Sequence, residues 1–204
     1  MTPLLIATWN KGKRRELQQL LSDLPFALMS LDDILGLEPV LETGGTFLEN
    51  ASLKASGYAI QSGLLTLADD SGLEVDALGG APGVLSARYA GDGASDRQRV
   101  EKLLGDLRNV DEPDRTARFV SAVATASSNG SIINMSVGRC EGRIAFEPRG
   151  SGGFGYDPIF IPAGSEMTFA ELPPEIKNQI SHRHTALEKA REFLRNLTCD
   201  SAAR

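Results

Sequence analysis

The stretch LLTLADDSG, residues Leu64 to Gly72, places two adjacent aspartates directly after an apolar run. The run predicts a buried strand, and Asp69 and Asp70 form its polar end, the usual address of ligand-binding groups in α/β sheets. Successive strand residues point to opposite faces, so both carboxylates can reach one ion only where the strand has broken, and Ser71-Gly72 predicts such a break. This segment alone leaves two interpretations equally open: a metal- and water-binding site, or an aspartate that caps a turn.

Strand and helix patterns alternate around this stretch. Apolar runs predict strands, and Asn129-Gly130 is a typical hairpin turn between the last two of them. Leucines at helical spacing, with Asn10, Thr46 and Ser95 as N-caps, predict helices. The predicted strands are 3–8, 26–31, 64–70, 117–127 and 131–146, and the predicted helices follow Asn10, follow Thr46, span 96–107 and run from about 184 to 197. This order predicts an α/β fold with a mixed central sheet and flanking helices.

The composition limits the class of protein. The chain has 204 residues and a net charge of −6, which argues against wrapping a nucleic-acid polymer. Neither a signal peptide nor a membrane-spanning run is recognisable, so no membrane association is expected. Cys140 and Cys199 form no disulfide framework, and a reducing, cytoplasmic location is expected.

The segment ATWNKGK, residues 7–13, joins a predicted strand to a predicted helix. The turn at Thr8 and Asn10 directs backbone N–H groups and the positive helix end toward one point, where a phosphate binds, and Lys13 adds a full charge. The alternative is an ordinary N-cap with a solvated basic turn, which this stretch alone favours.

The segment ETGGTFLENASLKA, residues 42–55, contributes a carboxylate and a second lysine. Glu42 completes a metal site with Asp70 in this interpretation, and Lys54 neutralises a second phosphate. The alternative is a surface loop followed by an amphipathic helix with a solvated lysine, which again is favoured for the segment alone.

The segment RGSGGFGYDPIF, residues 149–160, contains a literal G-x-G-x-x-G at Gly150, Gly152 and Gly155. A dinucleotide fingerprint requires a helix to begin there, and Pro158 disfavours one, so we reject that interpretation. We expect instead that the glycines allow a flat ligand to approach, with Phe154 stacking on a base and Asp157 bonding it. The alternative is a glycine-rich turn with Phe154 and Tyr156 in the core.

The segment EIKNQISHRHTAL, residues 175–187, places Lys177, His182 and Arg183 just before the last predicted helix. Such donors suit the carbonyl oxygens of a base. Two histidines alone do not predict zinc, and the alternative for His182 is a contact at the helix N-terminus.

Together these blocks, in order from about residue 4 to 195, resemble the inosine triphosphate pyrophosphatase family, whose bacterial branch is named non-canonical purine NTP pyrophosphatase or dITP/XTP pyrophosphatase. The resemblance implies one domain over residues 1–204, with two lobes around a nucleotide-binding cleft. It also implies a Mg²⁺-dependent homodimer that hydrolyses ITP, dITP and XTP to the monophosphate and pyrophosphate. The sequence departs from the family at two positions. Trp9 stands where a small or polar residue is usual, and His184 stands where glycine is common.

The resemblance also assigns residues. Asp70 is the catalytic, water-activating residue, and Glu42 and Asp70 bind the metal, with Asp69 in a supporting role. The remaining assignments are contacts to the substrate: Thr8, Trp9, Asn10, Lys11, Gly12, Lys13, Lys54, Ser71, Phe154, Gly155, Tyr156, Asp157, Lys177, His182 and Arg183. Three other functions stay open: a pyrophosphatase for other modified or pyrimidine nucleotides, a non-catalytic purine-nucleotide sensor and, most weakly, a dehydrogenase.

Overall fold

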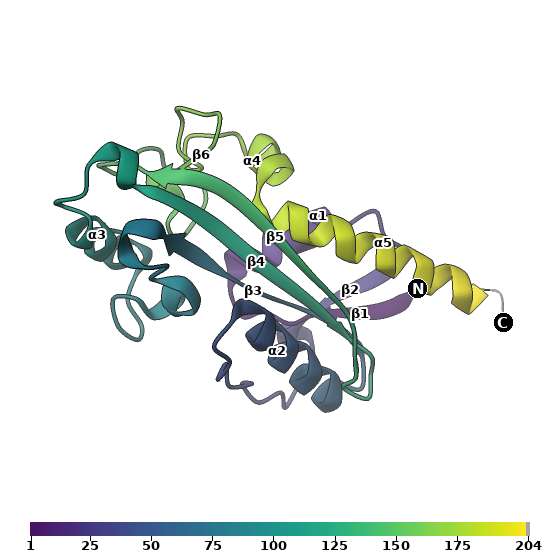
Figure 1. Cartoon of the computed structure of the whole chain (residues 1–204). Coiled ribbons are helices and arrows are strands. Elements are labelled where there is room, and N and C mark those ends of the chain that lie inside the picture. Colours follow the sequence, from purple (N-terminus) through teal and green to yellow (C-terminus); the bar gives the residue numbers. More distant parts are fainter. Residues whose placement is uncertain (203–204) are drawn as a thin grey trace. The chain divides into compact units, whose positions relative to one another are not determined.

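A computed structural model of the chain describes residues 1–202, and the side chains of residues 1–197. Its strands form one six-stranded sheet in the order β2-β1-β3-β4-β5-β6 (Figure 1). The strands are β1 (Thr2–Ile6), β2 (Phe26–Ser30), β3 (Leu65–Val75), β4 (Thr116–Ala126), β5 (Ile132–Ile144) and β6 (Phe160–Pro162). The helices are α1 (Lys11–Leu20), α2 (Phe47–Ser62), α3 (Asp96–Asp106), α4 (Pro174–Ile180) and α5 (His182–Ala202).

The sheet is mixed, as the sequence predicts. Strand β1 pairs in parallel with both β2 and β3, whereas β5 and β6 pair antiparallel. Strands β4 and β5 are neighbours joined by a tight turn, in which the Gly130 N–H donates to the Ser127 carbonyl at 2.8 Å. The expected mixed α/β fold and the hairpin at Asn129-Gly130 are therefore confirmed.

Three helices begin at the predicted caps. The Asn10 side chain accepts a hydrogen bond from the Lys13 N–H at the start of α1. Thr46 and Ser95 cap α2 and α3, each as part of a capping box. These caps satisfy backbone donors that have no partner within the helix, so each short motif determines where its helix begins.

The predicted break after Asp70 is wrong. Strand β3 continues through Ser71 and Gly72 to Val75, and the Leu73 N–H donates to the Ser86 hydroxyl at 2.9 Å. Glycine is a weak strand breaker when the backbone on either side finds partners. The two aspartates therefore lie within a continuous strand, and its alternation separates their side chains.

The C-terminal part also differs from the prediction. Helix α5 begins at His182, two residues before the predicted start, so His182 and Arg183 lie in its first turn. Lys177 belongs to the separate helix α4, and β6 is a strand of three residues; neither element was predicted. Elements this short carry too few residues for a periodic pattern.

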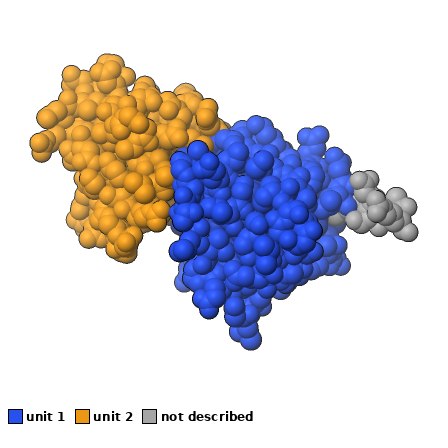
Figure 2. All heavy atoms as spheres, turned by 60° about the horizontal axis from the view of Figure 1, so that its bottom comes forward, with its two compact units in different colours: residues 1–70, 121–138, 183–204 blue, residues 71–120, 139–182 orange. Residues whose placement is uncertain are grey.

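The chain divides into two compact units (Figure 2). Unit 1 comprises residues 1–70, 121–138 and 183–204, and unit 2 comprises residues 71–120 and 139–182. The core of unit 1 joins β1, α1 and α5 through residues such as Leu4, Leu17 and Leu187. The core of unit 2 includes Leu103 of α3 and Phe160 of β6. The single domain over residues 1–204 and the nucleotide-binding cleft stay predictions.

Two further observations bear on the composition. Across the described residues, no helix is both long and apolar enough to cross a membrane. Cys140 of β5 is a buried free thiol, and the side chain of Cys199 lies outside the described residues.

Candidate active site

The loop between β1 and α1 has the geometry expected of a phosphate-binding turn. Thr8 is buried, and its hydroxyl accepts a hydrogen bond from the Asn10 N–H at 3.2 Å. Asn10 in turn caps α1, so Lys11 and Gly12 form the first turn of the helix. The N–H groups of that turn and the helix dipole favour an anion at this end of α1.

Trp9 is the single tryptophan of the chain and stands in this loop. Its side chain is 51% exposed, and its indole N–H donates to the Tyr58 hydroxyl of α2 at 2.8 Å. The indole N–H therefore links the loop to α2, while the residue as a whole stays exposed.

Asp69 is fully buried on the face of β3 that α1 and α5 cover. Its carboxylate lies 3.1 Å from the Lys13 ammonium and 3.6 Å from the Arg183 guanidinium, and it accepts a hydrogen bond from the Ser121 hydroxyl. Although burial acts to raise it, the pKa of Asp69 is held far below its ordinary value by Lys13, Arg183 and Ser121. Asp69 is therefore an ionised anchor for Lys13.

Arg183 belongs to the same buried cluster. Its guanidinium, 2% exposed, pairs with Glu16 of α1 as well as with Asp69. The structure thus places Arg183 in unit 1, whereas the other two predicted base-binding donors, Lys177 and His182, belong to unit 2. Its contact with a base stays a prediction.

Strand alternation directs the Asp70 side chain to the opposite face of β3, where it contacts Lys54 of α2. Helix α2 lies beside the sheet in Figure 1. The Lys54 ammonium lies 3.1 Å from an Asp70 carboxylate oxygen and 3.1 Å from a Glu42 carboxylate oxygen. Lys54 is itself buried. Burial alone acts to lower the pKa of its ammonium, but the negative charges of Asp70 and Glu42 outweigh this effect and raise the pKa. One buried ammonium thus bridges two carboxylates that lie far apart in the sequence.

These two carboxylates have opposite titration behaviour. Burial raises the pKa of the Asp70 carboxyl, and the negative charge of Glu42 raises it further against the effects of Lys13 and Lys54. The pKa of Glu42 is lowered: burial opposes the shift, but Lys54 and a hydrogen bond with Asp70 outweigh it. Asp70 is therefore the more basic group of the pair, which suits a general base.

The Glu42 and Asp70 pair fits a Mg²⁺ ion that also binds phosphate. Magnesium is usually held by one or two carboxylates together with substrate phosphates, not by a cage of protein ligands alone. The described side chains include no group of three or more His, Cys, Asp or Glu residues arranged to hold a metal. Asp69 points to the other face and is engaged by Lys13, so two carboxylates are the available donors here.

Unit 2 holds a second buried ion pair, between Asp157 and Lys177. The Lys177 ammonium lies 2.6 Å from an Asp157 carboxylate oxygen, and both side chains are at least nine-tenths buried. The same oxygen accepts a hydrogen bond from the Phe154 N–H at 2.8 Å. Lys177 also lies 4.9 Å from the centre of the Phe154 ring, so this aromatic side chain and a cation are held together.

The remaining predicted contacts of unit 2 are placed as follows. Tyr156 is buried and donates its hydroxyl to the Ser86 carbonyl at 2.9 Å, and burial raises its pKa. His182 is buried and stacks on Phe119, with ring centres 4.7 Å apart. Ser71 is half-buried in β3. The Tyr156 hydroxyl and the His182 ring therefore have defined structural contacts within unit 2.

The glycine-rich segment does not open a helix. After Gly155 the chain makes a short 3-10 turn, Asp157–Ile159, and enters β6. A side chain at Gly150 would clash with the backbone of Ala170, so at this position the glycine allows a close approach of the protein's own backbone. The absence of the dinucleotide-binding helix, expected from Pro158, is confirmed.

Three further residues contact these clusters, and none of them was predicted as a site residue. Ser121 and Glu16 support Asp69 and Arg183 in unit 1, and Asp96 accepts a hydrogen bond from the Gly155 N–H in unit 2. Glu16 follows Lys13 by three residues, a helical spacing that places both on one side of α1. That spacing could have indicated that Glu16 lies near Lys13, whereas no pattern in the sequence indicated the positions of Ser121 and Asp96.

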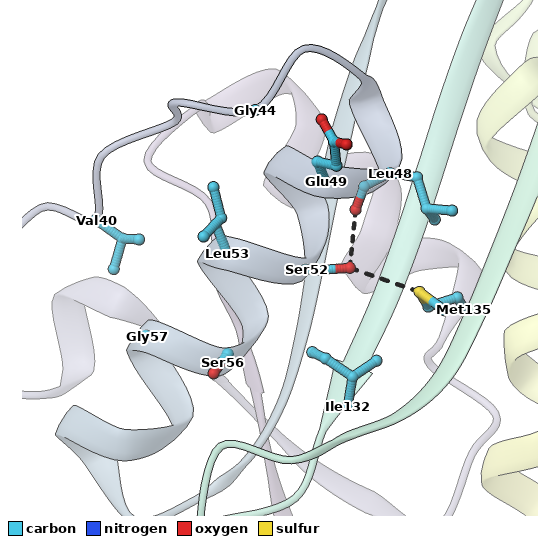
Figure 3. A pocket seen from close by; sticks show the side chains of 10 residues that line it. All are labelled: Val40, Gly44, Leu48, Glu49, Ser52, Leu53, Ser56, Gly57, Ile132 and Met135. Carbon is cyan, nitrogen blue, oxygen red and sulfur yellow. Dashed lines mark hydrogen bonds between the residues drawn. The ribbon is translucent and has the colours of Figure 1, made fainter.

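An apolar groove of about 720 Å³ lies in unit 1, beside α2 (Figure 3). The Ser52 hydroxyl of α2 donates to the Leu48 carbonyl and contacts the sulfur of Met135 at 3.6 Å. None of the predicted site residues lines the groove. Its lining residues are Val40, Gly44, Leu48, Glu49, Ser52, Leu53, Ser56, Gly57, Ile132 and Met135.

Comparisons with known proteins agree on one family. Residues 4–193 match the model of the Ham1 family. The chain is 50% identical over 194 residues to a dITP/XTP pyrophosphatase of Geobacter sulfurreducens, covering 95% of this chain and 97% of the relative, and 46% identical to one of Bacillus subtilis, covering 95% and 98%. A solved HAM1 protein structure from Coxiella burnetii superposes with a TM-score of 0.86 at 44% identity, covering 95% of this chain and 98% of that one.

Proposed function

The chain belongs to the Ham1 family, and from that premise we propose that it hydrolyses the non-canonical purine nucleoside triphosphates ITP, dITP and XTP to the monophosphate and pyrophosphate. Relatives that bear the name dITP/XTP pyrophosphatase cover nearly the whole chain at about half identity. The observation that carries the proposal is the contact of Lys54 with both Asp70 and Glu42. It places a carboxylate that can act as a base beside an ammonium that can bind phosphate.

The reaction is an attack of water on the α-phosphorus. Asp70 accepts a proton from the attacking water and so acts as the general base. Lys13 and Lys54 stabilise the charge that develops on the leaving pyrophosphate. Asp69 holds the Lys13 ammonium in place through their 3.1 Å ion pair. No covalent intermediate is needed, because pyrophosphate is a good leaving group when cations such as Lys13 and Lys54 stabilise its charge.

We propose Mg²⁺ as the cofactor, held by Glu42 and Asp70. When bound, it neutralises phosphate charge and polarises the reacting phosphorus. Support comes from the carboxylates of Glu42 and Asp70, which the shared contact with Lys54 brings to one point. Removal of the metal with a chelator is expected to abolish turnover and leave the fold intact.

Selection of the base rests on the buried donors of unit 2. Hypoxanthine and xanthine carry a 6-oxo acceptor, whereas adenine carries a 6-amino donor. If Lys177 or His182 donates a hydrogen bond to the 6-oxo oxygen, that donor is left unpaired when ATP binds. In sites built to hydrogen-bond the substrate, such a mismatch lowers kcat/KM for the wrong substrate by about 10⁴-fold. Phe154, beside Lys177, provides the ring on which the base stacks.

We also propose that the protein is a homodimer in the cytoplasm. The resemblance to the inosine triphosphate pyrophosphatases supports the dimer, and the free, buried thiol of Cys140 agrees with a reducing compartment. Light scattering on the purified chain tests the dimer, since the monomer mass is 21.8 kDa.

A nucleotide panel with identified products tests the proposed function. With Mg²⁺, the protein is expected to release pyrophosphate from ITP, dITP and XTP, and little from ATP or GTP. Tight nucleotide binding without turnover would indicate the non-catalytic sensor instead. Preferential turnover of pyrimidine or other modified nucleotides would indicate the alternative pyrophosphatase.

A further inference from the structure

We propose that Asp96, the first residue of α3, is a positioning residue that orients the turn Phe154–Asp157 for binding the base. The inference rests on the proposed function, because it concerns how the base is held. Asp96 carries none of the family motifs quoted from the sequence, and it comes from a different element than the turn.

The first observation is a direct contact. An Asp96 carboxylate oxygen accepts a hydrogen bond from the Gly155 N–H at 2.7 Å. Gly155 has a φ of 62°, in the left-handed region that favours glycine. The carboxylate thus binds the backbone at the point where the turn takes its least common conformation, directly after Phe154.

The second carboxylate oxygen of Asp96 also has a partner. It pairs with the Arg99 guanidinium, which donates to the carbonyls of Ala87 at 2.7 Å and Ala94 at 2.8 Å. Arg99 is therefore attached to the backbone that precedes α3. Because its two oxygens bind different groups, the Asp96 carboxylate has one defined orientation, and a longer side chain does not reproduce it.

Two carboxylates accept hydrogen bonds from two consecutive backbone N–H groups of the turn. The Phe154 N–H donates to Asp157, whose carboxylate also binds Lys177, and the next N–H, that of Gly155, donates to Asp96. The direction in which the Phe154 ring is presented depends on both bonds. Asp157 already belongs to the predicted base site, whereas Asp96 acts on that site through Gly155.

Asp96 is not required to cap α3. Ser95 is the N-cap, and its side chain accepts from the Gln98 N–H while the Gln98 side chain accepts from the Ser95 N–H. The backbone donors at this helix start are thus served by the neighbouring residues. A Ser95→Ala variant consequently weakens the start of α3 without touching Gly155, and it is the matched control for Asp96→Ala.

The test compares Asp96→Ala, Asp96→Glu and Ser95→Ala with the wild type. For ITP, Asp96→Ala is expected to raise KM about fivefold, the lower end of the cost of losing base stacking, with little change in kcat. Inorganic pyrophosphate, which has no base, is expected to inhibit all four proteins equally. Asp96→Glu keeps the charge and is expected to resemble Asp96→Ala, while Ser95→Ala keeps the wild-type KM.

The outcomes separate this inference from the proposed function. If the wild type releases no pyrophosphate from ITP, the proposed function fails and the inference fails with it. If the wild type is active and the KM of Asp96→Ala equals that of Ser95→Ala, or pyrophosphate inhibition weakens in parallel with ITP binding, only the inference is overturned. Should Asp96→Ala not fold, the same comparison is made with Asp96→Glu, for which a wild-type KM overturns the inference.

Discussion

Asp69 and Asp70 are consecutive residues of β3, yet their carboxylates bind different lysines on opposite faces of the strand. Asp69 contacts Lys13 at 3.1 Å, and Asp70 contacts Lys54 at 3.1 Å. Because the strand alternates, α1 supplies the first lysine and α2 the second. The pair thus separates two positions: Asp69 anchors the Lys13 ammonium, and Asp70, the proposed general base, shares the Lys54 ammonium with Glu42.

Replacement of Asp70 by asparagine removes the proposed general base. We expect kcat for ITP to fall by about 10²–10⁴-fold, the usual contribution of a positioned base, with a smaller change in KM. Pyrophosphate release measured with saturating Mg²⁺ checks this. Near wild-type turnover in Asp70→Asn would exclude the water-activating role.

Replacement of Asp69 by asparagine acts mainly on stability. The substitution leaves the Lys13 ammonium without its carboxylate partner and leaves Arg183 with Glu16 alone. Loss of one partner of a buried ion pair costs about 3–5 kcal/mol. Urea denaturation measures the free energy of unfolding. The control is Asp76→Asn, since Asp76 is an exposed carboxylate paired with Arg118, and there we expect a loss below about 1 kcal/mol. Equal losses in both variants would contradict the anchoring role.

The contribution of Asp69 to stability depends on pH in a defined direction. Its pKa is lower in the folded protein than in the unfolded chain, where it is about 3.9. The unfolded state therefore binds the proton first as the pH falls, so the contribution is complete above the unfolded pKa and declines below it. The stability difference between wild type and Asp69→Asn is expected to stay constant from about pH 8 to 6 and to shrink below about pH 4. A difference that grows toward acid pH would contradict the lowered pKa.

Cys140 is expected to be dispensable for turnover. It is buried in β5, and burial raises the pKa of its thiol to about 11, so little thiolate exists near neutral pH. Cys140→Ser is expected to keep kcat/KM for ITP within about twofold of the wild type, because the thiolate is the reactive form of cysteine. A folded Cys140→Ser variant that loses activity would show that the thiol takes part in the reaction.

Phe154→Leu tests the stacking of the base. Leucine retains apolar bulk but has no aromatic face, so KM for ITP is expected to rise about tenfold. Inhibition by inorganic pyrophosphate serves as the internal control and is expected to stay unchanged. An unchanged KM would place the base away from Phe154.

Local signals predicted the parts of the fold that local contacts determine. The helix starts at Asn10, Thr46 and Ser95 follow from side chains that cap backbone groups within three residues. The continuation of β3 past Gly72 was missed, because it depends on a partner elsewhere in the chain, the Ser86 hydroxyl. The early start of α5 was missed as well, since the leucine and alanine pattern begins only at Ala186.

The candidate site shows the same division. The resemblance predicted Glu42, Lys54 and Asp70 together, and the structure brings them into contact. It also grouped Arg183 with the base-binding residues, whereas the structure pairs Arg183 with Glu16 and Asp69. Asp96 acts through the backbone of Gly155, and such a contact leaves no pattern of spacing in the sequence.

Hydrolysis of ITP in ¹⁸O-labelled water identifies the phosphorus atom that the water attacks. Attack on the α-phosphorus transfers the oxygen of water to the monophosphate, so we expect mass spectrometry to find ¹⁸O in IMP and none in pyrophosphate. The label in pyrophosphate, or the release of orthophosphate in its place, would contradict the mechanism.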